Sequence, residues 1–359
     1  MLPAGRRFYF DALGTDPLQA IRTQARLADE PGPDPAQLAA DEVLLRVRAA
    51  NVGWVDLLMA SGQYQHVPTL PYTPGLEFSG EVVATGPGVE RWKVGDRVIA
   101  DGLLTGPRSL GAHRGQGGFA SYARAPAEAL IPLPEGYNFD QGACLLGGAE
   151  TAYHALVTRG RLQAGETALI LGATGSTGLS AVALAKHLGA RVIAVGRSLE
   201  KLAAAQHQGA DHLVALGPNS PPLKEQVKLH TEGRGAELIY DPVGGPLSVE
   251  ALRAAAFGAR FIVVGWASTP TAGRGEHQPN QLPTNLILMK SLDVLGSPAA
   301  ISAHKDPAMR AARLSAILAA APALRPHVDV TFPMAQAQEA LEAKWSGRHP
   351  GNVVLHPNE

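Results

Sequence analysis

The sequence is poor in the features that mark secreted, membrane-spanning and nucleic-acid-binding proteins. It has one cysteine, Cys144, which excludes an intrachain disulfide and a zinc lobe built on several cysteines. Its net charge is -1, from 31 basic and 32 acidic side chains, and no run of like charges is present to bind a nucleic-acid backbone or an anionic membrane. No apolar stretch approaches the roughly 20 residues that a membrane span needs. We therefore expect a cytoplasmic protein that binds neither nucleic acid nor membrane.

Aromatic residues are also few, at 5%, whereas 45% of the chain is hydrophobic and glycine (40) and proline (28) are abundant. This apolar content is too high for a disordered chain, and the frequent turns suit an α/β enzyme. Because 359 residues exceed what one hydrophobic core usually supports, two domains are expected.

Two patterns of secondary structure divide the chain. Residues 41–145 carry short β-type runs separated by glycine and proline, which predict an antiparallel, barrel-like domain. From about residue 150, strand-like runs alternate with helical runs, which predicts βαβ units and a parallel sheet. A long polar segment, 267–284, lies between two strand-like runs, and such segments are usually functional or mobile.

A glycine-rich turn lies in the second pattern, in LILGATGSTGLSAVALAKHLGARVIAVGRS, residues 169–198. A strict Gly-x-Gly-x-x-Gly motif is not met, because Ala173 occupies its first position, but its last two glycines are kept. In the Rossmann fold these two glycines let the backbone approach a pyrophosphate and let the helix pack closely on the strand, while the helix N-terminus binds the phosphates. The residues expected to bind a dinucleotide here are Gly172, Gly175, Ser176, Thr177 and Gly178.

The type of cofactor is decided at the end of the second strand. Enzymes that use NAD carry an Asp or Glu there, which accepts a hydrogen bond from the ribose 2'-hydroxyl. Here the position is Gly196, followed by Arg197, Ser198 and Lys201, so nothing repels a 2'-phosphate and two cations can bind it. The sequence therefore predicts NADPH. The alternative is that Arg197 and Lys201 are solvated residues at the start of a helix.

Nearly the whole chain, from about 41 to 355, resembles the medium-chain dehydrogenase/reductase superfamily, in its zinc-free quinone oxidoreductase branch. The resemblance depends on several stretches in order: SGQYQHVPTLPYTPGLEFSGEVVATGPGVERWKVGDRV, GGFASYARAPAEALIPLPEG, TAYHAL, the glycine turn, YDPVGG, PTNLILMKSLDVLG and SGRHPGNVVL. It implies an α/β protein with a GroES-like β domain over 1–146, completed by 298–359, and a doubly wound Rossmann domain over 147–297. It also implies a cleft between the domains and a homodimer joined at the Rossmann sheet edge, for which FIVVGWAS is the expected strand.

The sequence departs from the zinc-dependent relatives at their metal ligands. The cysteine ligand of those relatives falls near NVGWVD and the histidine ligand near PGLEFSG, where this chain has Gly53 and Leu76. Neither residue binds a metal, and Glu77 alone is not a site, so no metal is expected. Without a Lewis acid, the acceptor must itself be activated, which points to a quinone or a conjugated enone.

Three residues of the first domain are candidates for the acceptor site. Tyr64 matches a tyrosine that points into the cleft of similar reductases, and a phenol can donate a hydrogen bond or a proton to a developing oxyanion; the alternative is a tyrosine packed on the barrel with its hydroxyl bonded to backbone. Trp54 can stack on a flat aromatic acceptor. Asn51 lies two residues from the position where quinone reductases commonly carry an asparagine.

The resemblance adds three residues on the nicotinamide side of the cofactor. Thr151 and Asn285 match positions that border the cofactor in the family, although they can equally be an ordinary helix residue and a loop residue. Gly265 ends a strand and allows close passage of the cofactor, although glycine is common at strand ends.

Together these expectations describe a zinc-independent reductase that transfers a hydride from NADPH to a quinone or an α,β-unsaturated carbonyl in the interdomain cleft. One alternative is an enoyl-thioester reductase on the same scaffold, for which Arg108, His113 and Arg114 can supply cations. Another is an NADPH-binding sensor without turnover.

Overall fold

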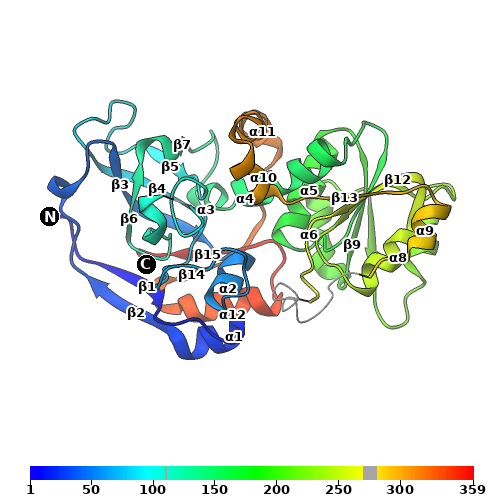
Figure 1. The fold of residues 1–359 in the computed structure, drawn as a ribbon, viewed down its shortest axis with the longest axis horizontal. Coiled ribbons are helices and arrows are strands. Elements are labelled where there is room, and N and C mark those ends of the chain that lie inside the picture. Colours follow the sequence, from blue (N-terminus) through cyan, green and yellow to red (C-terminus); the bar gives the residue numbers. More distant parts are fainter. Residues whose placement is uncertain (110, 270–280) are drawn as a thin grey trace. The chain divides into compact units, whose positions relative to one another are not determined.

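The structure, a computed structural model, describes residues 1–109, 111–269 and 281–359. The chain forms two compact units (Figure 1). Unit 1 comprises Met1–Leu146 and Val328–Glu359, and unit 2 comprises Gly147–His327. The structure describes each unit by itself. Most of the segment expected to be functional at 267–284 lies outside the described residues, since 270–280 are not described.

One segment lies in a different unit from the one expected. Residues 298–327 were expected to complete the first domain, but they belong to unit 2. They contain α10 (Ala299–Lys305) and α11 (Pro307–Ala320). The physical reason is an ion-pair cluster that joins α11 to Glu150 at the start of unit 2. Nothing in the local sequence of these alanine-rich helices indicates that partner.

Unit 1 is built on a seven-stranded sheet in the order β14-β15-β3-β4-β5-β7, with β6 paired to β3. The pairs are antiparallel except for β14 and β15, and β1 and β2 form a separate antiparallel pair. The strands are β1 (Gly5–Phe10), β2 (Ala25–Glu30), β3 (Glu42–Asn51), β4 (Phe78–Thr85), β5 (Arg97–Ala100), β6 (Tyr122–Pro126), β7 (Leu130–Pro132), β14 (Val328–Pro333) and β15 (Asn352–His356). The helices and short helical turns are α1 (Pro17–Gln19), η1 (Ala20–Gln24), η2 (Pro35–Gln37), α2 (Trp54–Ala60), η3 (Ala112–Gly115), η4 (Ala127–Ala129), α3 (Phe139–Ala143), η8 (Met334–Gln336) and α12 (Ala337–Ser346).

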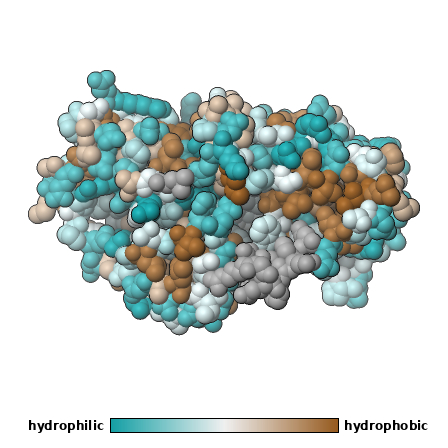
Figure 2. Space-filling model, viewed as in Figure 1, coloured by the Kyte–Doolittle hydropathy of each residue, from teal (hydrophilic) through white to brown (hydrophobic). Residues whose placement is uncertain are grey.

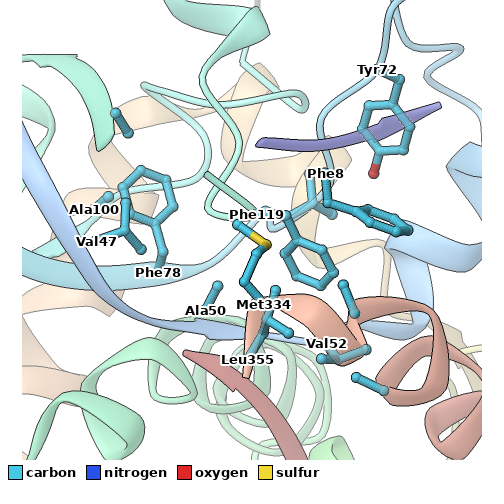
Figure 3. Close-up of a cluster of buried hydrophobic side chains, with 14 of the residues drawn as sticks. Phe8, Val47, Ala50, Val52, Tyr72, Phe78, Ala100, Phe119, Met334 and Leu355 are labelled. Atoms are coloured by element: carbon cyan, nitrogen blue, oxygen red, sulfur yellow. The ribbon is translucent and has the colours of Figure 1, made fainter. Parts of the chain in front are cut away.

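The core of unit 1 joins both ends of the chain. Figure 3 shows apolar side chains from the N-terminal strands packed with Met334 and Leu355 from the C-terminal segment. Burial of these side chains supplies most of the favourable free energy of the unit. The buried residues labelled there are Phe8, Val47, Ala50, Val52, Tyr72, Phe78, Ala100, Phe119, Met334 and Leu355.

Unit 2 contains a six-stranded parallel sheet in the order β10-β9-β8-β11-β12-β13. The strands are β8 (Thr167–Ile170), β9 (Arg191–Gly196), β10 (His212–Ala215), β11 (Ala236–Asp241), β12 (Ala255–Val263) and β13 (Asp293–Gly296). Besides α10 and α11, its helices are α4 (Leu146–Tyr153), η5 (His154–Arg159), α5 (Ser176–His187), α6 (Leu199–His207), α7 (Leu223–Leu229), α8 (Pro246–Ala254), α9 (Thr284–Met289) and η7 (Ala321–Ala323). The chain runs outward from β8 to β10 and then returns to the other side of β8. The sheet is therefore doubly wound, and its strand order reverses between β8 and β11, where such sheets bind ligands.

The strand expected at the edge of this sheet lies inside it. FIVVGWAS begins within β12, which pairs with β11 on one side and with β13 on the other. The edge strand is β13 instead, a four-residue strand after α9. Residues 260–263 of β12 pair with strands on both sides. A continuous apolar run such as FIVV is typical of an interior parallel strand.

No helix in the described part of the chain has both the length and the apolar character required to cross a bilayer.

Candidate active site

The glycine turn after β8 has the geometry of a nucleotide-binding loop. Gly172 adopts a left-handed conformation, with φ of +59°, which disfavours other residues. A Cβ atom on Gly178 would collide with the carbonyl oxygen of Gly172, so only glycine lets α5 lie this close to the turn. At Gly175 a Cβ atom would meet only the Gly172 oxygen, at 3.5 Å, and the residue is exposed. The N–H of Gly175 donates to the Gly172 carbonyl at 3.0 Å, but the space beside its Cα atom is open to a ligand.

The first turn of α5 faces the same opening. Gly175 is the N-cap of α5 and offers no side-chain oxygen to the first N–H groups of the helix. Ser176 and Thr177 follow it, and both are partly buried. A helix start without a capping side chain, next to an open glycine, is suited to hold a pyrophosphate.

The end of β9 lies beside this turn, because β9 pairs in parallel with β8 and the N–H of Ala173 donates to the carbonyl of Val195 at 3.0 Å. At Gly196 a Cβ atom would lie 3.1 Å from side-chain carbons of Leu202 and Thr174, so a larger residue would be crowded. Arg197 next to it is exposed.

Ser198 is the N-cap residue of α6, the helix that follows β9. Its hydroxyl accepts a hydrogen bond from the backbone N–H of Lys201 at 3.4 Å, which fixes the start of the helix directly after Arg197. Topology thus places Gly196, Arg197, Ser198 and Lys201 at the carboxyl end of the sheet, near the glycine turn.

Asp241, which was not predicted as a site residue, supports the glycine turn from the side of β11. Asp241, in the YDPVGG stretch, is fully buried, and its carboxylate accepts hydrogen bonds from the N–H groups of Val243 and Gly244, both at 2.9 Å. The hydroxyl of Ser248 donates to it at 2.5 Å. Burial raises the pKa of Asp241. The loop that it holds lies against Gly172, since a Cβ atom there would be 2.9 Å from Val243. The sequence indicated Asp241 only through the YDPVGG stretch, to which no role was assigned.

The three residues expected near the nicotinamide lie on separate elements. Thr151 is partly buried on α4, Asn285 is exposed on α9, and Gly265 follows β12. The N–H of Gly265 donates to the carbonyl of Asp241 at 3.2 Å, which puts Gly265 beside the YDPVGG loop. Within the described residues, no hydrogen bond joins Thr151 or Asn285 to the glycine turn.

In unit 1, the three acceptor-site candidates have distinct surroundings. Trp54 begins α2 and stacks on Trp345, with ring centroids 5.0 Å apart, so one face of its indole is already covered. Tyr64 is partly buried against the core, its ring lies 5.8 Å from that of His66, and no described residue hydrogen-bonds to its hydroxyl. The backbone hydrogen bond of the alternative interpretation is therefore not formed with any described residue.

Asn51 is only 6% exposed, and its Nδ2 donates to the carboxylate of Glu77 at 2.7 Å. Its Oδ1 is buried with no partner among the described residues. The side-chain amide of Asn51 therefore donates a hydrogen bond within the protein, while its Oδ1 acceptor is not used by any described residue.

The places of the metal ligands in zinc-dependent relatives do not form a metal site. Gly53 has no side chain to offer, and Leu76 is buried in the core. Glu77 is bound to Asn51. No group of three or more His, Cys, Asp or Glu side chains that is suited to a metal ion occurs in the described part of the chain. This donor set does not fit zinc.

A buried carboxylate holds the loop around Gly53. Asp56 accepts hydrogen bonds from the Gly53 N–H at 3.0 Å, the Gly75 N–H at 2.8 Å and the Tyr72 hydroxyl at 3.0 Å. Burial raises the pKa of Asp56 to about 6, against the opposing effect of these three donors. The position of Trp54, one residue after Gly53, is thus set by Asp56.

Comparison with known proteins identifies the family. The model of the alcohol dehydrogenase GroES-like domain matches residues 39–135, and that of the zinc-binding dehydrogenase matches residues 176–310. Quinone oxidoreductase-like protein 2 of Mus musculus is 32% identical over 352 residues, which cover 97% of this chain and 92% of the mouse protein.

Two solved structures agree with this result. A probable oxidoreductase from Mycobacterium abscessus has a TM-score of 0.80 at 25% identity, covering 99% of this chain and 100% of that one. A mycobacterial protein complexed with NADPH has a TM-score of 0.76 at 25% identity, covering 98% and 100%. Fold and relatives therefore define an enzyme, a nicotinamide-dependent oxidoreductase with a GroES-like and a Rossmann domain. The chain belongs to the medium-chain dehydrogenase/reductase superfamily, in its quinone oxidoreductase-like branch.

Proposed function

We propose that the protein is an NADPH-dependent reductase of quinones or related α,β-unsaturated carbonyls that works without zinc. The observation that carries the choice of NADPH is the end of β9, where Gly196 is crowded against any larger residue and exposed Arg197 follows it. A carboxylate for a ribose 2'-hydroxyl is missing, and a guanidinium for a 2'-phosphate is present. When bound, the cofactor supplies the hydride.

The cofactor contacts proposed in unit 2 follow from the described edge of the sheet. Backbone N–H groups at the start of α5 bind the pyrophosphate, which lies against Gly175, while Arg197, Ser198 and Lys201 surround the 2'-phosphate. Gly172 and Gly178 keep the turn compact. Thr151, Gly265 and Asn285 are proposed on the nicotinamide side, and the interdomain cleft remains a prediction.

Gly53 and Leu76, at the places of the zinc ligands in zinc-dependent relatives, offer no metal donor, which supports an acceptor that is already electrophilic. We place Tyr64 as the hydrogen-bond or proton donor to the oxygen on which negative charge develops, because its hydroxyl has no described partner. Trp54 can stack on a flat acceptor with its remaining face. Asn51 is proposed near this region with its unpaired Oδ1 as an acceptor.

The test is oxidation of NADPH, followed by its absorbance, with naphthoquinone, phenanthrenequinone, a short enone and crotonyl-CoA, with NADH in parallel. Turnover of quinones with NADPH preferred supports the proposal. Turnover of crotonyl-CoA alone would instead identify an enoyl-thioester reductase. Of the side chains expected to bind the thioester's phosphates, His113 already contacts an acidic residue, since its Nε2 lies 2.8 Å from a carboxylate oxygen of Glu42. Binding of NADPH with no acceptor reduced would indicate a sensor.

We also propose a homodimer joined at the edge strand β13. Apolar side chains gather over this part of unit 2 (Figure 2): Val294 of β13 is 38% exposed, and Leu288, Met289 and Phe257 beside it are 73–81% exposed. An exposed sheet edge flanked by apolar groups is suited to pair with a second copy. Light scattering of Leu288→Glu should show a monomer, whereas Leu229→Glu, at an 82% exposed leucine on α7, should leave the dimer intact.

The single buried cysteine suits a reducing compartment, and we propose a cytoplasmic location.

A further inference from the structure

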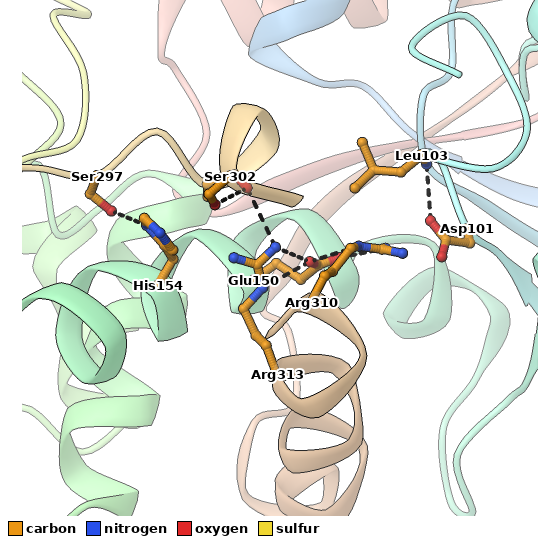
Figure 4. Close-up of polar contacts among 9 residues, drawn as sticks. Asp101, Leu103, Glu150, His154, Ser297, Ser302, Arg310 and Arg313 are labelled. Atoms are coloured by element: carbon orange, nitrogen blue, oxygen red, sulfur yellow. Dashed lines mark hydrogen bonds and ion pairs between the residues drawn. The ribbon is translucent and has the colours of Figure 1, made fainter. Parts of the chain in front are cut away.

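Helix α4 is attached to the rest of unit 2 by buried polar side chains rather than by apolar packing alone. Glu150 lies on α4 and is 8% exposed, and His154, four residues later, is 3% exposed. Residues four apart share one face of a helix. His154 Nδ1 lies 2.8 Å from the hydroxyl of Ser297, just after β13. His154 begins η5, which continues α4, so this helical face is fixed at two points, one turn apart (Figure 4).

Glu150 is the centre of an ion-pair cluster with two arginines of α11. Arg310 donates to both carboxylate oxygens, from Nη2 at 2.9 Å and from Nε at 3.2 Å. Arg313 donates to Oε2 from Nη2 at 2.7 Å and from Nε at 3.1 Å. Four charge-assisted hydrogen bonds on one carboxylate define its position closely, because guanidinium groups bind in a planar, directional way.

The cluster is not the arrangement that stability alone would favour. Two guanidinium groups face one carboxylate, and both arginines are at most 9% exposed, so several charges are removed from water at this site. The Nη1 atom of Arg313 is also buried with no partner among the described residues. Apolar residues of similar volume often stabilise such a site equally well or better, whereas a charged cluster fixes one geometry. The cluster is therefore suited to set the position of α4.

The position of α4 matters because two of its other residues, Gly148 and Thr151, lie against α5 and are proposed beside the nicotinamide, respectively. Gly148 lies so close to α5 that a Cβ atom there would collide with the hydroxyl of Ser180 and approach the carbonyl of Ser176 to 3.6 Å. Thr151, directly after Glu150, is the residue proposed beside the nicotinamide. A shift of α4 would thus change both its contact with the start of α5 and the place of Thr151.

We infer that Glu150 is a positioning residue, which acts through Arg310 and Arg313 to hold α4, and with it Thr151, in the place required by the nicotinamide end of the cofactor. The inference rests on the proposed function through the role of Thr151. It separates two parts of cofactor binding: the adenosine end depends on β9 and its following residues, and the nicotinamide end depends on α4 and the cluster.

The first test compares Glu150→Gln with the intact enzyme. Binding of adenosine 2',5'-bisphosphate, measured by calorimetry, reports on the adenosine end, and kcat together with NADPH affinity reports on the nicotinamide end. We expect a loss in kcat of about tenfold to a hundredfold, because misplacement of reacting groups by an ångström has effects of that size, and bisphosphate affinity within about twofold of the parent. Equal losses in both would reduce Glu150 to a purely structural role and overturn the inference.

A second variant covers the case in which Glu150→Gln does not fold, since it removes the negative charge that two buried arginines bind. Arg310→Met keeps the carboxylate of Glu150 paired with Arg313 and should fold. It should show the same selective loss in kcat, in smaller measure. A folded Arg310→Met enzyme with unchanged kcat would overturn the inference.

Glu166→Gln is the matched control. It breaks a partly buried ion pair of unit 2, between Glu166 and Arg260 at 2.6 Å, close to the start of β8 rather than its end. We expect it to lower the melting temperature without a selective loss in kcat. Failure of the proposed function is distinguishable, because the ratio of NADPH affinity to bisphosphate affinity can be compared between variants even if no acceptor is turned over.

Discussion

Units 1 and 2 hold their candidate residues by different means. In unit 2, the glycine turn and the residues after β9 lie at neighbouring strand ends of a parallel sheet, so their proximity follows from the order of the strands. In unit 1, Asn51 lies at the end of a strand, Trp54 at a helix start and Tyr64 on a loop. Individual side chains from other parts of the chain contact Asn51 and Trp54. Trp345 covers Trp54, and Glu77 binds Asn51.

The two kinds of site should respond differently to substitution. A site at strand ends is fixed by backbone geometry, so its weak points are positions where a side chain cannot fit. A site on loops is fixed by individual side chains, so single polar substitutions should alter it with little effect on the fold. The predictions below test this contrast, in order of decreasing expected effect.

The largest effect is expected from a methyl group in the glycine turn of unit 2. Gly178→Ala places a carbon against the Gly172 carbonyl and should separate α5 from the turn, lowering the free energy of unfolding by about 1–3 kcal/mol and abolishing NADPH binding. Gly175→Ala has room for the methyl group, so it should keep its stability and lose only cofactor affinity. Urea titration and NADPH fluorescence measure the two quantities. Equal destabilisation by both variants would contradict the backbone argument.

The next prediction concerns pH, to which the two units should respond with opposite sign. In unit 2, burial first, and then the charges of Arg313 and Arg159, lower the pKa of His154 to about 4, from 6.5. The folded state therefore disfavours the proton, and a contribution of up to about 3 kcal/mol, present above pH 6.5, is lost as the pH falls toward 4.

In unit 1, burial raises the pKa of Asp56 from 3.8 to about 6, so the folded state favours the proton. Its contribution, of similar size, is present below pH 3.8 and is lost as the pH rises through 6. Unfolding free energies from pH 4 to 7 should therefore fall less steeply on acidification for His154→Gln than for the parent, and more steeply for Asp56→Asn. Identical pH slopes in all three proteins would refute both assignments.

In the site of unit 1, Tyr64→Phe removes one hydroxyl from a residue whose ring packs on the core. We expect kcat to fall about a hundredfold with unchanged stability, the size typical of a lost proton donor. Tyr9→Phe, at another partly buried tyrosine of unit 1, serves as the control and should retain full activity. A Tyr64→Phe enzyme with parental kcat would leave Tyr64 with a packing role alone.

The sequence predicted most of unit 2 and less of unit 1 for physical reasons. The glycines of the turn and the residues after β9 are close in sequence, and their placement at neighbouring strand ends follows from local backbone geometry. Trp54 and Asn51 contact residues that are distant in sequence, Trp345 and Glu77. The sequence around Asn51 does not indicate that its amide donates to Glu77. The same limit applies to residues 298–327, which were assigned to the wrong unit because Arg310 and Arg313 are some 160 residues from their partner Glu150. The choice of β12 as the sheet edge failed because β13 is short.

The smallest effect is expected at the end of β9, where the substitution removes one exposed charge. Arg197→Ala should reduce the preference for NADPH over NADH by about tenfold to a hundredfold, the equivalent of the roughly 1.5–3 kcal/mol of a charge-assisted hydrogen bond. Arg191→Ala removes a second exposed arginine, at the opposite end of the same strand, and should leave the preference unchanged. The effect of Arg197→Ala should also shrink as salt is added, since exposed charges are screened. If both variants keep the parental ratio of kcat/KM for the two cofactors, Arg197 is only a solvated residue, and cofactor choice must depend on Lys201 or on the shape of the pocket around Gly196.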